Sequence, residues 1–223
     1  MFAEKNDSYL NFQNTDVTIS SFIFSTKQYD SLTLIPTFSP KNFIPVTANL
    51  DEKQIVRMIY NSKQSILLQF LLYNPVANDK SYYSTIDSAL IIAANRGIKV
   101  KLLVSDWSIG EPSISYLKKL SSLQNFEIKY ISIPDSKEGY IPFARVDNCK
   151  FIVSDSTACW IGTSNAEKSY FYNSRDAGAL VYNKKLTAQV YNIFMKDWNS
   201  QYSHAIIPGG SYKPREHGER TAN

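Results

Sequence analysis

Histidine and cysteine are both scarce in this chain of 223 residues, which contains two of each. The histidines, His204 and His217, lie near the C-terminal end, so a His-rich zinc site and any mechanism that requires two central histidines are excluded. Cys149 and Cys159 are too few for a disulfide framework, and we interpret them as two small buried thiols. The sequence has no Cys-x-x-Cys, no glycine-rich phosphate loop and no Gly-x-Ser-x-Gly elbow, and no cofactor is expected.

Long apolar runs and a strong charge of either sign are also missing. The longest apolar run, Ile66–Tyr73, is interrupted by Gln69 and is far shorter than the ~20 residues of a membrane-spanning helix. Residues 1–18 lack the basic and then apolar profile of a signal peptide. Because 24 basic and 20 acidic residues leave a net charge of only +4, with no basic stripe, charge alone does not indicate nucleic-acid binding. We therefore expect no transmembrane segment.

From Asn49 onward the sequence alternates between helix and strand patterns. Ile55, Met58 and Ile59 recur at helical spacing, and Gly97 follows a second helical segment at the position of a left-handed C-cap. The pattern predicts helices after Asn49 and over Ser84–Asn95, Pro112–Leu123 and Lys185–Asn199, and strands over Val17–Phe24, Ile66–Tyr73, Ile98–Val104, Phe126–Ile133, Phe143–Val146, Lys150–Val153, Ala158–Ile161 and Ala177–Val181. Buried strands that alternate with helices are typical of a layered α/β fold.

Polar side chains gather at the ends of two of these short predicted strands. Asn148 and Lys150 are two residues apart, so they share one face of an extended segment, where a buried lysine requires a compensating anion or partner. Residues 162–165 place hydroxyl and amide donors directly after another strand. Two adjacent strand ends of this kind would form a phosphate cradle. The alternative interpretation is a surface lysine beside an ordinary polar turn.

The motif Asn148-x-Lys150-x4-Asp155, followed by Gly162-Thr163-Ser164-Asn165, resembles the signature of the phospholipase D superfamily, which is His-x-Lys-x4-Asp and then Gly-x-x-Asn. The resemblance covers roughly Pro36–His204. Within the superfamily, the chain is similar to the branch that contains endolysosomal exonuclease-like members and the poxvirus nicking-joining enzyme. The resemblance implies a layered α/β/α half with a mixed, buried β-sheet. The resemblance also implies a remnant of a first half (residues 1–34) and a phospholipase D-like domain with one degenerate motif (residues 35–204). Because apolar periodicity is lost after Pro208, we expect residues 205–223 to form a disordered tail.

Asn148 is the main departure from the family signature. In the family one motif histidine attacks phosphorus and the other protonates the leaving oxygen, whereas an amide nitrogen is neither a useful nucleophile nor a base near pH 7. The resemblance implies a degenerate catalytic set in which Lys150 is a point charge on a phosphoryl oxygen, Asn148 donates to the phosphate and Asp155 orients the neighbouring polar groups. The substrate-binding residues that it implies are Thr163, Ser164 and Asn165.

The family normally carries two copies of the motif, and this chain resembles the second copy. A homodimer, or pairing with a full-length relative, would rebuild the two-fold geometry of the site. His204 matches a closing segment of the family and is not expected to replace the motif histidine. The resemblance favours a protein that binds phosphodiesters, either phospholipid or nucleic acid, with weak or absent hydrolysis. Two alternatives stay open: half of a nuclease whose partner chain supplies the catalytic histidine, and a non-catalytic interaction remnant.

The poxvirus envelope-wrapping proteins of the same superfamily resemble this chain in carrying Asn-x-Lys-x4-Asp. Their association with membranes and phospholipid implies that Asn148 is a functional variant, and it favours a viral, membrane-linked protein. The sequence itself leaves the compartment open between a soluble, cytoplasmic location and a peripheral one at a virion or host membrane.

Overall fold

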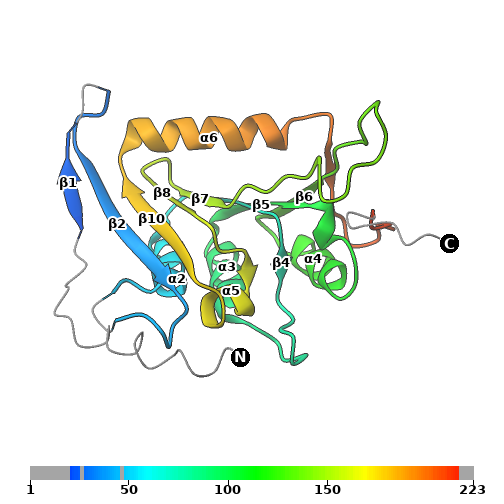
Figure 1. Cartoon of the computed structure of the whole chain (residues 1–223), viewed down its shortest axis with the longest axis horizontal. Helices are drawn as coiled ribbons and strands as arrows, with labels where there is room; N and C mark the ends of the chain where they lie inside the picture. Colours follow the sequence, from blue (N-terminus) through cyan, green and yellow to red (C-terminus); the bar gives the residue numbers. More distant parts are fainter. Residues whose placement is uncertain (1–20, 26–27, 46–47, 216–223) are drawn as a thin grey trace, which may run out of the picture.

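The computed structural model describes residues 21–25, 28–45 and 48–215 (Figure 1). The strands of its large sheet are β1 (Phe22–Phe24), β2 (Leu32–Ser39), β3 (Ser65–Phe70), β5 (Lys99–Ser105), β6 (Phe126–Ile131), β7 (Phe151–Ser154), β8 (Ala158–Gly162), β10 (Asp176–Tyr182) and β11 (Ser203–Ala205). Within the described residues these nine strands follow the order β1-β2-β10-β8-β7-β3-β5-β6-β11. Two further short strands, β4 (Tyr73–Asn74) and β9 (Ala166–Glu167), pair with each other.

Helices cover both faces of the large sheet. They are α2 (Asp51–Asn61), α3 (Thr85–Asn95), α4 (Ser113–Ser121), α5 (Lys168–Tyr172) and α6 (Lys184–Trp198), and a short 3-10 helix spans Asp106–Ser108. Figure 1 shows α2, α3, α4 and α5 on one side of the sheet and α6 lying across the other side. This arrangement confirms the predicted layered α/β fold with a mixed sheet buried between helices.

The central strand β3 separates two hydrophobic cores. Ile66, Leu68 and Phe70 belong to the core shared with α2, α3 and α4, and Leu67 belongs to the core beneath α6. Each of these side chains contributes ~1.5–3 kcal/mol by leaving water. Gln69 is also fully buried, although it is polar, so hydrogen bonds must offset the loss of its hydration.

Helix α6 is capped at its start by a side chain, and α3 is followed by the glycine that the sequence predicts at a C-cap. The side chain of Asn183 accepts a hydrogen bond from the backbone N–H of Leu186 at 2.9 Å, which caps the first turn of α6. Phe194 and Trp198 then bury one side of this helix against the sheet. After α3, Gly97 has a φ of +86°, as its C-cap position predicted.

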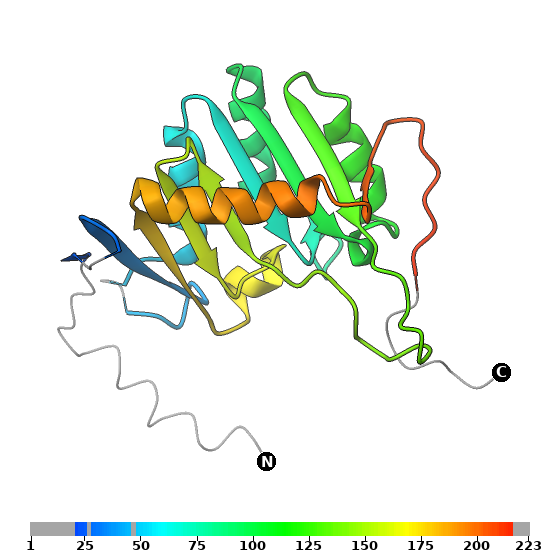
Figure 2. The same cartoon turned by 90° about the horizontal axis from the view of Figure 1, so that it is seen from above.

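The strand directions bring many loops to one end of the sheet, which we call the carboxyl end. β3, β5 and β6 are parallel, β2 and β8 run with them, and β7 and β10 run in the opposite direction. The carboxyl ends of β2, β3, β5, β6 and β8 therefore lie beside the amino ends of β7 and β10. Figure 2 shows the long segment between β6 and β7 running along this end of the sheet. Ligands of open α/β folds commonly bind at such an end.

The prediction of a strand over Phe143–Val146 is wrong, because this segment forms a turn and a bend. Phe143 and Arg145 have φ values of 57° and 56°, which a β-strand does not allow. The ring of Phe143 lies 6.2 Å from the ring of Trp107, centroid to centroid. Its apolar character therefore reflects packing in a loop, and not strand pairing.

Strand β2 was not predicted from the sequence, since Pro36 interrupts its pattern. It crosses residues 34 and 35, where the sequence places a domain boundary, and it pairs with β10 from Thr33 to Ser39. The short elements α5, β9 and β11 were also not predicted, and β4 overlaps the predicted strand Ile66–Tyr73 at Tyr73 alone. Of the predicted strand Val17–Phe24, residues 22–24 form β1 and residues 17–20 lie outside the described residues.

The C-terminal segment after β11 returns to the body of the molecule. Tyr212 packs edge-on against Tyr130 with ring centroids 5.8 Å apart, so residues 205–215 contact the domain. The rest of the predicted disordered tail, residues 216–223, lies outside the described residues, as do residues 1–20. In the part of the chain that the structure describes, no helix is long and apolar enough to cross a membrane.

Candidate functional site

The β7–β8 hairpin brings the two predicted strand ends together at the carboxyl end. Phe151 pairs with Ile161 in this antiparallel hairpin, so the residues just outside it, Lys150 and Gly162, also face each other. The backbone N–H of Gly162 donates to the carbonyl oxygen of Lys150 at 3.2 Å. The adjacency on which the phosphate cradle depends is therefore present.

Lys150 and Asn148 are in direct contact. The Lys150 ammonium donates to the side-chain oxygen of Asn148 at 2.5 Å and to its backbone carbonyl at 3.1 Å. Burial lowers the pKa of Lys150, and the nearby Cys149, Asp147 and Asp176 partly oppose this shift. An anion bound at this ammonium would favour its charged form. The amide oxygen of Asn148 faces the lysine, which leaves the amide NH₂ group as the donor for a ligand.

Asn165 contributes a buried amide to the same end of the sheet. Its side-chain oxygen accepts a hydrogen bond from the backbone N–H of Leu72 at 3.1 Å, just beyond the end of β3. The residue is 0% exposed, and its Nδ2 atom has no hydrogen-bond partner within the described residues. A buried donor without an acceptor costs ~1–3 kcal/mol, so this amide group is ready for an acceptor such as a phosphoryl oxygen.

Asp51 holds the loop that carries Asn165. This fully buried carboxylate, at the start of α2, accepts hydrogen bonds from Ser164 (2.6 Å), Thr37 (2.6 Å) and Trp160 (2.7 Å). Burial raises the pKa of Asp51, and the three hydrogen bonds act against that shift. The network ties β2, β8 and α2 to the residue before Asn165, which fixes the position of the amide.

Two glycines allow Trp160 to lie against its neighbouring strands. A Cβ atom at Gly162 would be 2.3 Å from the Trp160 ring, and one at Gly178 would be 2.7 Å from the indole nitrogen. Only glycine fits at both positions without moving backbone or ring. The glycine in the Gly-Thr-Ser-Asn sequence therefore has a packing role in this structure, beneath the candidate site.

Thr163 and Asp176 form the other wall of the site. The Thr163 hydroxyl donates to Asp176 Oδ1 at 2.8 Å and accepts from the backbone N–H of Ala177 at 3.2 Å. The second oxygen, Asp176 Oδ2, is buried and has no hydrogen-bond partner within the described residues. Sequence reasoning missed Asp176, although it directly precedes the predicted strand Ala177–Val181. We call Asn148, Lys150, Thr163, Asn165 and Asp176 the Lys150 site.

A buried bridge fixes the chain where it enters β7. The Nε2 atom of Gln69 donates to Asp147 at 2.8 Å and to Asp197, near the end of α6, at 2.9 Å. The other oxygen of Asp147 accepts from the backbone N–H of Cys149 at 3.1 Å. Burial raises the pKa of Asp147, with a smaller contribution from Asp197. The bridge orients the backbone on both sides of Asn148. It was not predicted from the sequence.

The structure does not bring Asp155 to the Lys150 site. β7 spans the four residues between them, so Lys150 and Asp155 lie at opposite ends of this strand. The Asp155 carboxylate accepts hydrogen bonds from the backbone N–H groups of residues 63–65 at 2.7–2.9 Å. It therefore holds the start of β3 and does not contact the polar groups near Lys150.

No imidazole lies at the Lys150 site among the described residues. His204 is on β11 at the far side of the sheet, and β3, β5 and β6 separate that strand from β7. His217 lies outside the described residues. Cys149 is partly buried, and its burial together with the neighbouring Asp147 raises the pKa of the thiol to about 12, so it is a poor nucleophile as well.

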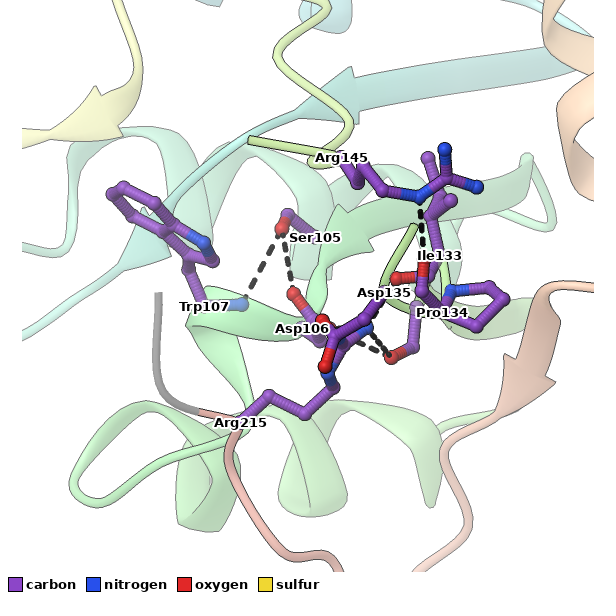
Figure 3. Close-up of polar contacts among 9 residues, drawn as sticks. Ser105, Asp106, Trp107, Ile133, Pro134, Asp135, Arg145 and Arg215 are labelled. Carbon is purple, nitrogen blue, oxygen red and sulfur yellow. Dashed lines mark hydrogen bonds and ion pairs between the residues drawn. The ribbon is translucent and has the colours of Figure 1, made fainter. Parts of the chain in front are cut away.

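A second polar cluster lies further along the carboxyl end, where β5 and β6 end (Figure 3). We call it the Asp106 cluster, and it consists of Asp106, Ser132, Asp135, Arg145 and Arg215. The buried Asp106 carboxylate accepts from Ser132 at 2.7 Å and lies 3.9 Å from the Arg215 guanidinium, which also pairs with Asp135. Figure 3 shows Arg145 bonded through its Nε to a backbone carbonyl of the same segment. The cluster fastens the β6–β7 segment and the C-terminal residues to β5.

Comparison with known proteins gives a consistent result. The family model described as "Cardiolipin synthase, PLD-like domain" matches residues 55–198. Phospholipase D Y of Dictyostelium discoideum is 34% identical over 174 residues, which are 75% of this chain and 40% of that protein. The 5'-3' exonuclease PLD3 of Rattus norvegicus is 32% identical over 183 residues, which are 75% of this chain and 37% of that protein. The chain thus spans about two fifths of the length of these relatives.

Solved structures share the fold at low sequence identity. Nuc from Salmonella typhimurium, described as a phospholipase D family member, superposes with a TM-score of 0.59 at 18% identity and covers 79% of this chain and 99% of its own. NucT from Helicobacter pylori gives the same TM-score at 15% identity. These likenesses concern the fold, and they agree with the mixed sheet and helical layers described above.

Proposed function

This chain belongs to the family of phospholipase D-like domains, and we propose that it binds a phosphodiester at the Lys150 site while hydrolysing it weakly or not at all on its own. The observation that carries the proposal is the buried Nδ2 atom of Asn165, which has no hydrogen-bond partner within the described residues and lies at the end of the sheet where Lys150 supplies an ammonium. An ammonium and an amide donor together match the oxygens of a phosphate anion.

Each residue of the site has a role in this proposal. Lys150 neutralises one phosphoryl oxygen, and the NH₂ groups of Asn165 and Asn148 donate hydrogen bonds to the phosphate. Thr163 and Ser164 keep the loop in place through their own hydrogen bonds to Asp176 and Asp51. Phosphate binding would relieve the unpaired donor at Asn165, which supports the proposal on energetic grounds.

The described residues place no imidazole at the Lys150 site, and this limits the chemistry that we propose. The amide of Asn148 cannot attack phosphorus, because its nitrogen lone pair is delocalised into the carbonyl group, and it cannot protonate a leaving oxygen. Loss of general acid–base catalysis alone reduces rates ~10²–10⁴-fold. We therefore expect binding without efficient turnover. The relatives are named as phospholipases D and 5'-3' exonucleases, and the phosphodiester is the bond that phospholipids and nucleic acids share.

The test of binding uses dimethyl phosphate, a phosphodiester without acyl chains or bases, followed by phosphorus NMR titration. Lys150→Ala is expected to weaken binding about tenfold or more, since a charge-assisted hydrogen bond contributes ~1.5–3 kcal/mol. The matched control is Lys99→Ala, because Lys99 is exposed at the amino end of β5, at the opposite end of the sheet. Equal affinity of the Lys150→Ala variant and the wild type would contradict the proposed site.

The test of turnover uses bis(p-nitrophenyl) phosphate, whose cleavage releases a coloured product. The purified chain is expected to give a rate near the uncatalysed background, and no phosphorylated protein should be trapped after quenching with denaturant at alkaline pH, at which a phosphohistidine is stable. Brisk hydrolysis by the chain alone, or a covalent phosphoryl intermediate, would show that the loss of the motif histidine is compensated and that the proposal is wrong.

A further inference from the structure

A cavity of about 430 Å³ lies between α3 and α4, which pack on β5 and β6. Figure 1 shows these two helices on the same side of the large sheet. The cavity shares no lining residue with the Lys150 site, and the function proposed above does not use it. Its size lies within the ~300–1,000 Å³ of pockets that hold small molecules.

Most of the cavity wall is apolar or aromatic. Ile91 of α3 and Leu120 of α4 line it, and Leu123 lies just after α4. The rings of Tyr82 and Tyr116 also line it, and they stack on each other with centroids 5.6 Å apart and planes 12° apart. A wall of this kind suits a ligand with a flat apolar body.

Asp87, in the first turn of α3, brings a buried carboxylate to this cavity. It is 4% exposed, and its two oxygens accept hydrogen bonds from the hydroxyl of Tyr73, at 2.6 Å, and from that of Tyr82. Burial, together with the Asp87 carboxylate, raises the pKa of both tyrosines, so the hydroxyls keep their protons and Asp87 remains the acceptor. The start of α3 also stabilises the negative charge.

The Asp87 carboxylate still lacks a counter-ion, because it makes no ion pair with the described residues. Among the lining residues Lys119 is the cation, but it is exposed and its ammonium bonds to none of the described residues. A carboxylate has about four lone-pair positions, and the two hydroxyls occupy half of them. An ammonium group in the cavity would therefore find an acceptor and would pair a buried charge.

We infer that the cavity binds a small organic ammonium with an aromatic body, whose charged group pairs with Asp87 and whose ring packs against Tyr82 and Tyr116. This site is independent of the proposed function. An anionic ligand fits less well, because its charge would lie beside the Asp87 carboxylate within apolar walls. A neutral apolar ligand would cover the carboxylate and leave it without a counter-ion.

NMR titration of the chain with phenethylamine, which carries one ammonium group and one aromatic ring, tests this inference. Two probes with the same ring serve for comparison: phenethyl alcohol, which has no charge, and hydrocinnamate, which is an anion. Phenethylamine is expected to bind saturably and about tenfold more tightly than either, since a hydrogen bond to a charged group is the stronger kind. Equal affinity for the alcohol, tighter binding of hydrocinnamate, or no saturable binding of the amine would overturn the inference.

A charge-neutral variant separates a ligand-binding role of Asp87 from a purely structural one. Asp87→Asn keeps the shape of the side chain and is expected to weaken phenethylamine binding about tenfold. Its matched control is Glu127→Gln, which neutralises an exposed carboxylate on β6 and should bind as the wild type does. If Asp87→Asn weakens the binding of the amine and the alcohol equally, Asp87 only holds its two tyrosines, and the inference is wrong.

A second variant keeps the test decisive if Asp87→Asn does not fold. Tyr116 is only partly buried, and Tyr116→Ala should weaken phenethylamine binding about threefold through the loss of ring contacts. Tyr182→Ala, which removes a ring 43% exposed at the end of β10, should not change it. Equal affinity of the Tyr116→Ala and Tyr182→Ala variants would overturn the inference.

Lys150→Ala separates this site from the phosphate site. This variant should bind phenethylamine as tightly as the wild type does, although it loses affinity for dimethyl phosphate. A loss of amine affinity in Lys150→Ala would place the amine at the Lys150 site and overturn the inference. Thermal unfolding of each variant checks that the fold is intact.

Discussion

The two polar clusters at the carboxyl end of the sheet differ in whether their buried groups have partners. In the Asp106 cluster, Asp106 and Asp135 share the guanidinium of Arg215. In the Lys150 site, the Nδ2 atom of Asn165 and the Oδ2 atom of Asp176 are buried and have no hydrogen-bond partner within the described residues. Both clusters lie where loops leave the same strand ends, so position alone does not distinguish them.

The difference indicates what each cluster stabilises. Charged groups that pair with each other hold their loops in place, and this pairing stabilises the folded chain. An unpaired buried group reduces the stability of the folded chain by ~1–3 kcal/mol. A ligand oxygen that accepts from the Asn165 amide recovers this loss, whereas a phosphodiester has no proton to donate to Asp176 Oδ2. We therefore expect substitutions in the Asp106 cluster to change stability alone, and those in the Lys150 site to change ligand binding.

The largest expected effect is at Asp51, which supports the Lys150 site from below. Asp51→Ala leaves the buried hydroxyls of Thr37 and Ser164 without their acceptor, and it leaves the Trp160 indole N–H with only its 3.2 Å bond to the Thr37 hydroxyl, so the free energy of unfolding should fall by about 3–5 kcal/mol. Urea unfolding of the variant and the wild type measures this change. A loss below about 1 kcal/mol would mean that water or another group replaces the carboxylate, and that Asp51 does not position the loop.

A smaller effect is expected at Arg215, in the paired cluster. Its guanidinium is partly exposed, so Arg215→Ala should lower the free energy of unfolding by about 1 kcal/mol. The affinity for dimethyl phosphate should stay within about twofold of the wild type, because the cluster lies at the ends of β5 and β6, and β3 separates these strands from β7 in the sheet. Weakened phosphate binding in this variant would contradict the separate roles of the two clusters, since it would show that they act together.

The comparison also shows which parts of the site a sequence can predict. Asn148, Lys150 and Asn165 were found together because short strands with polar ends often form a hairpin, and the hairpin is local. Asp51 could not be found in this way, because it lies 113 residues from Ser164 and only the completed sheet brings them together. A carboxylate in the first turn of a helix commonly interacts with the helix dipole, whereas the side chain of Asp51 accepts hydrogen bonds from three donors of other elements.

The fold was predicted where elements are long and periodic, as in β3, β5 and α6. It was missed where strands are short or interrupted, as in β2 with Pro36 and in the β4–β9 pair, because their stability comes from partners distant in sequence. The spacing of Lys150 and Asp155 also indicates that the two side chains do not share a site. A strand of four residues between them places the two side chains at opposite ends of β7.

The smallest expected effect concerns the pH dependence of the bridge between Asp147, Gln69 and Asp197. Because burial raises the pKa of Asp147 above its usual 3.8, the folded chain holds this proton more tightly than the unfolded chain does. The contribution of Asp147 to stability is therefore complete below about pH 3.8 and declines as the pH rises through the raised value. Asp147→Asn should gain stability relative to the wild type as the pH increases from about 4 to about 7, measured by urea unfolding at each pH.

Asp79 provides a control of opposite sign for this prediction. Hydrogen bonds from Ser81, with a smaller contribution from Lys168, lower the pKa of this exposed carboxylate to about 2. Its contribution to stability is present above pH 3.8 and is lost as the pH falls through the lowered value, so Asp79→Asn should lose stability relative to the wild type near neutral pH. Parallel pH profiles for the Asp147→Asn and Asp79→Asn variants would mean that the bridge holds Asp147 no differently from a surface carboxylate. In that case the backbone around Asn148 would be positioned by the β7–β8 hairpin alone, and the Lys150 site would depend on Asp51 for its support.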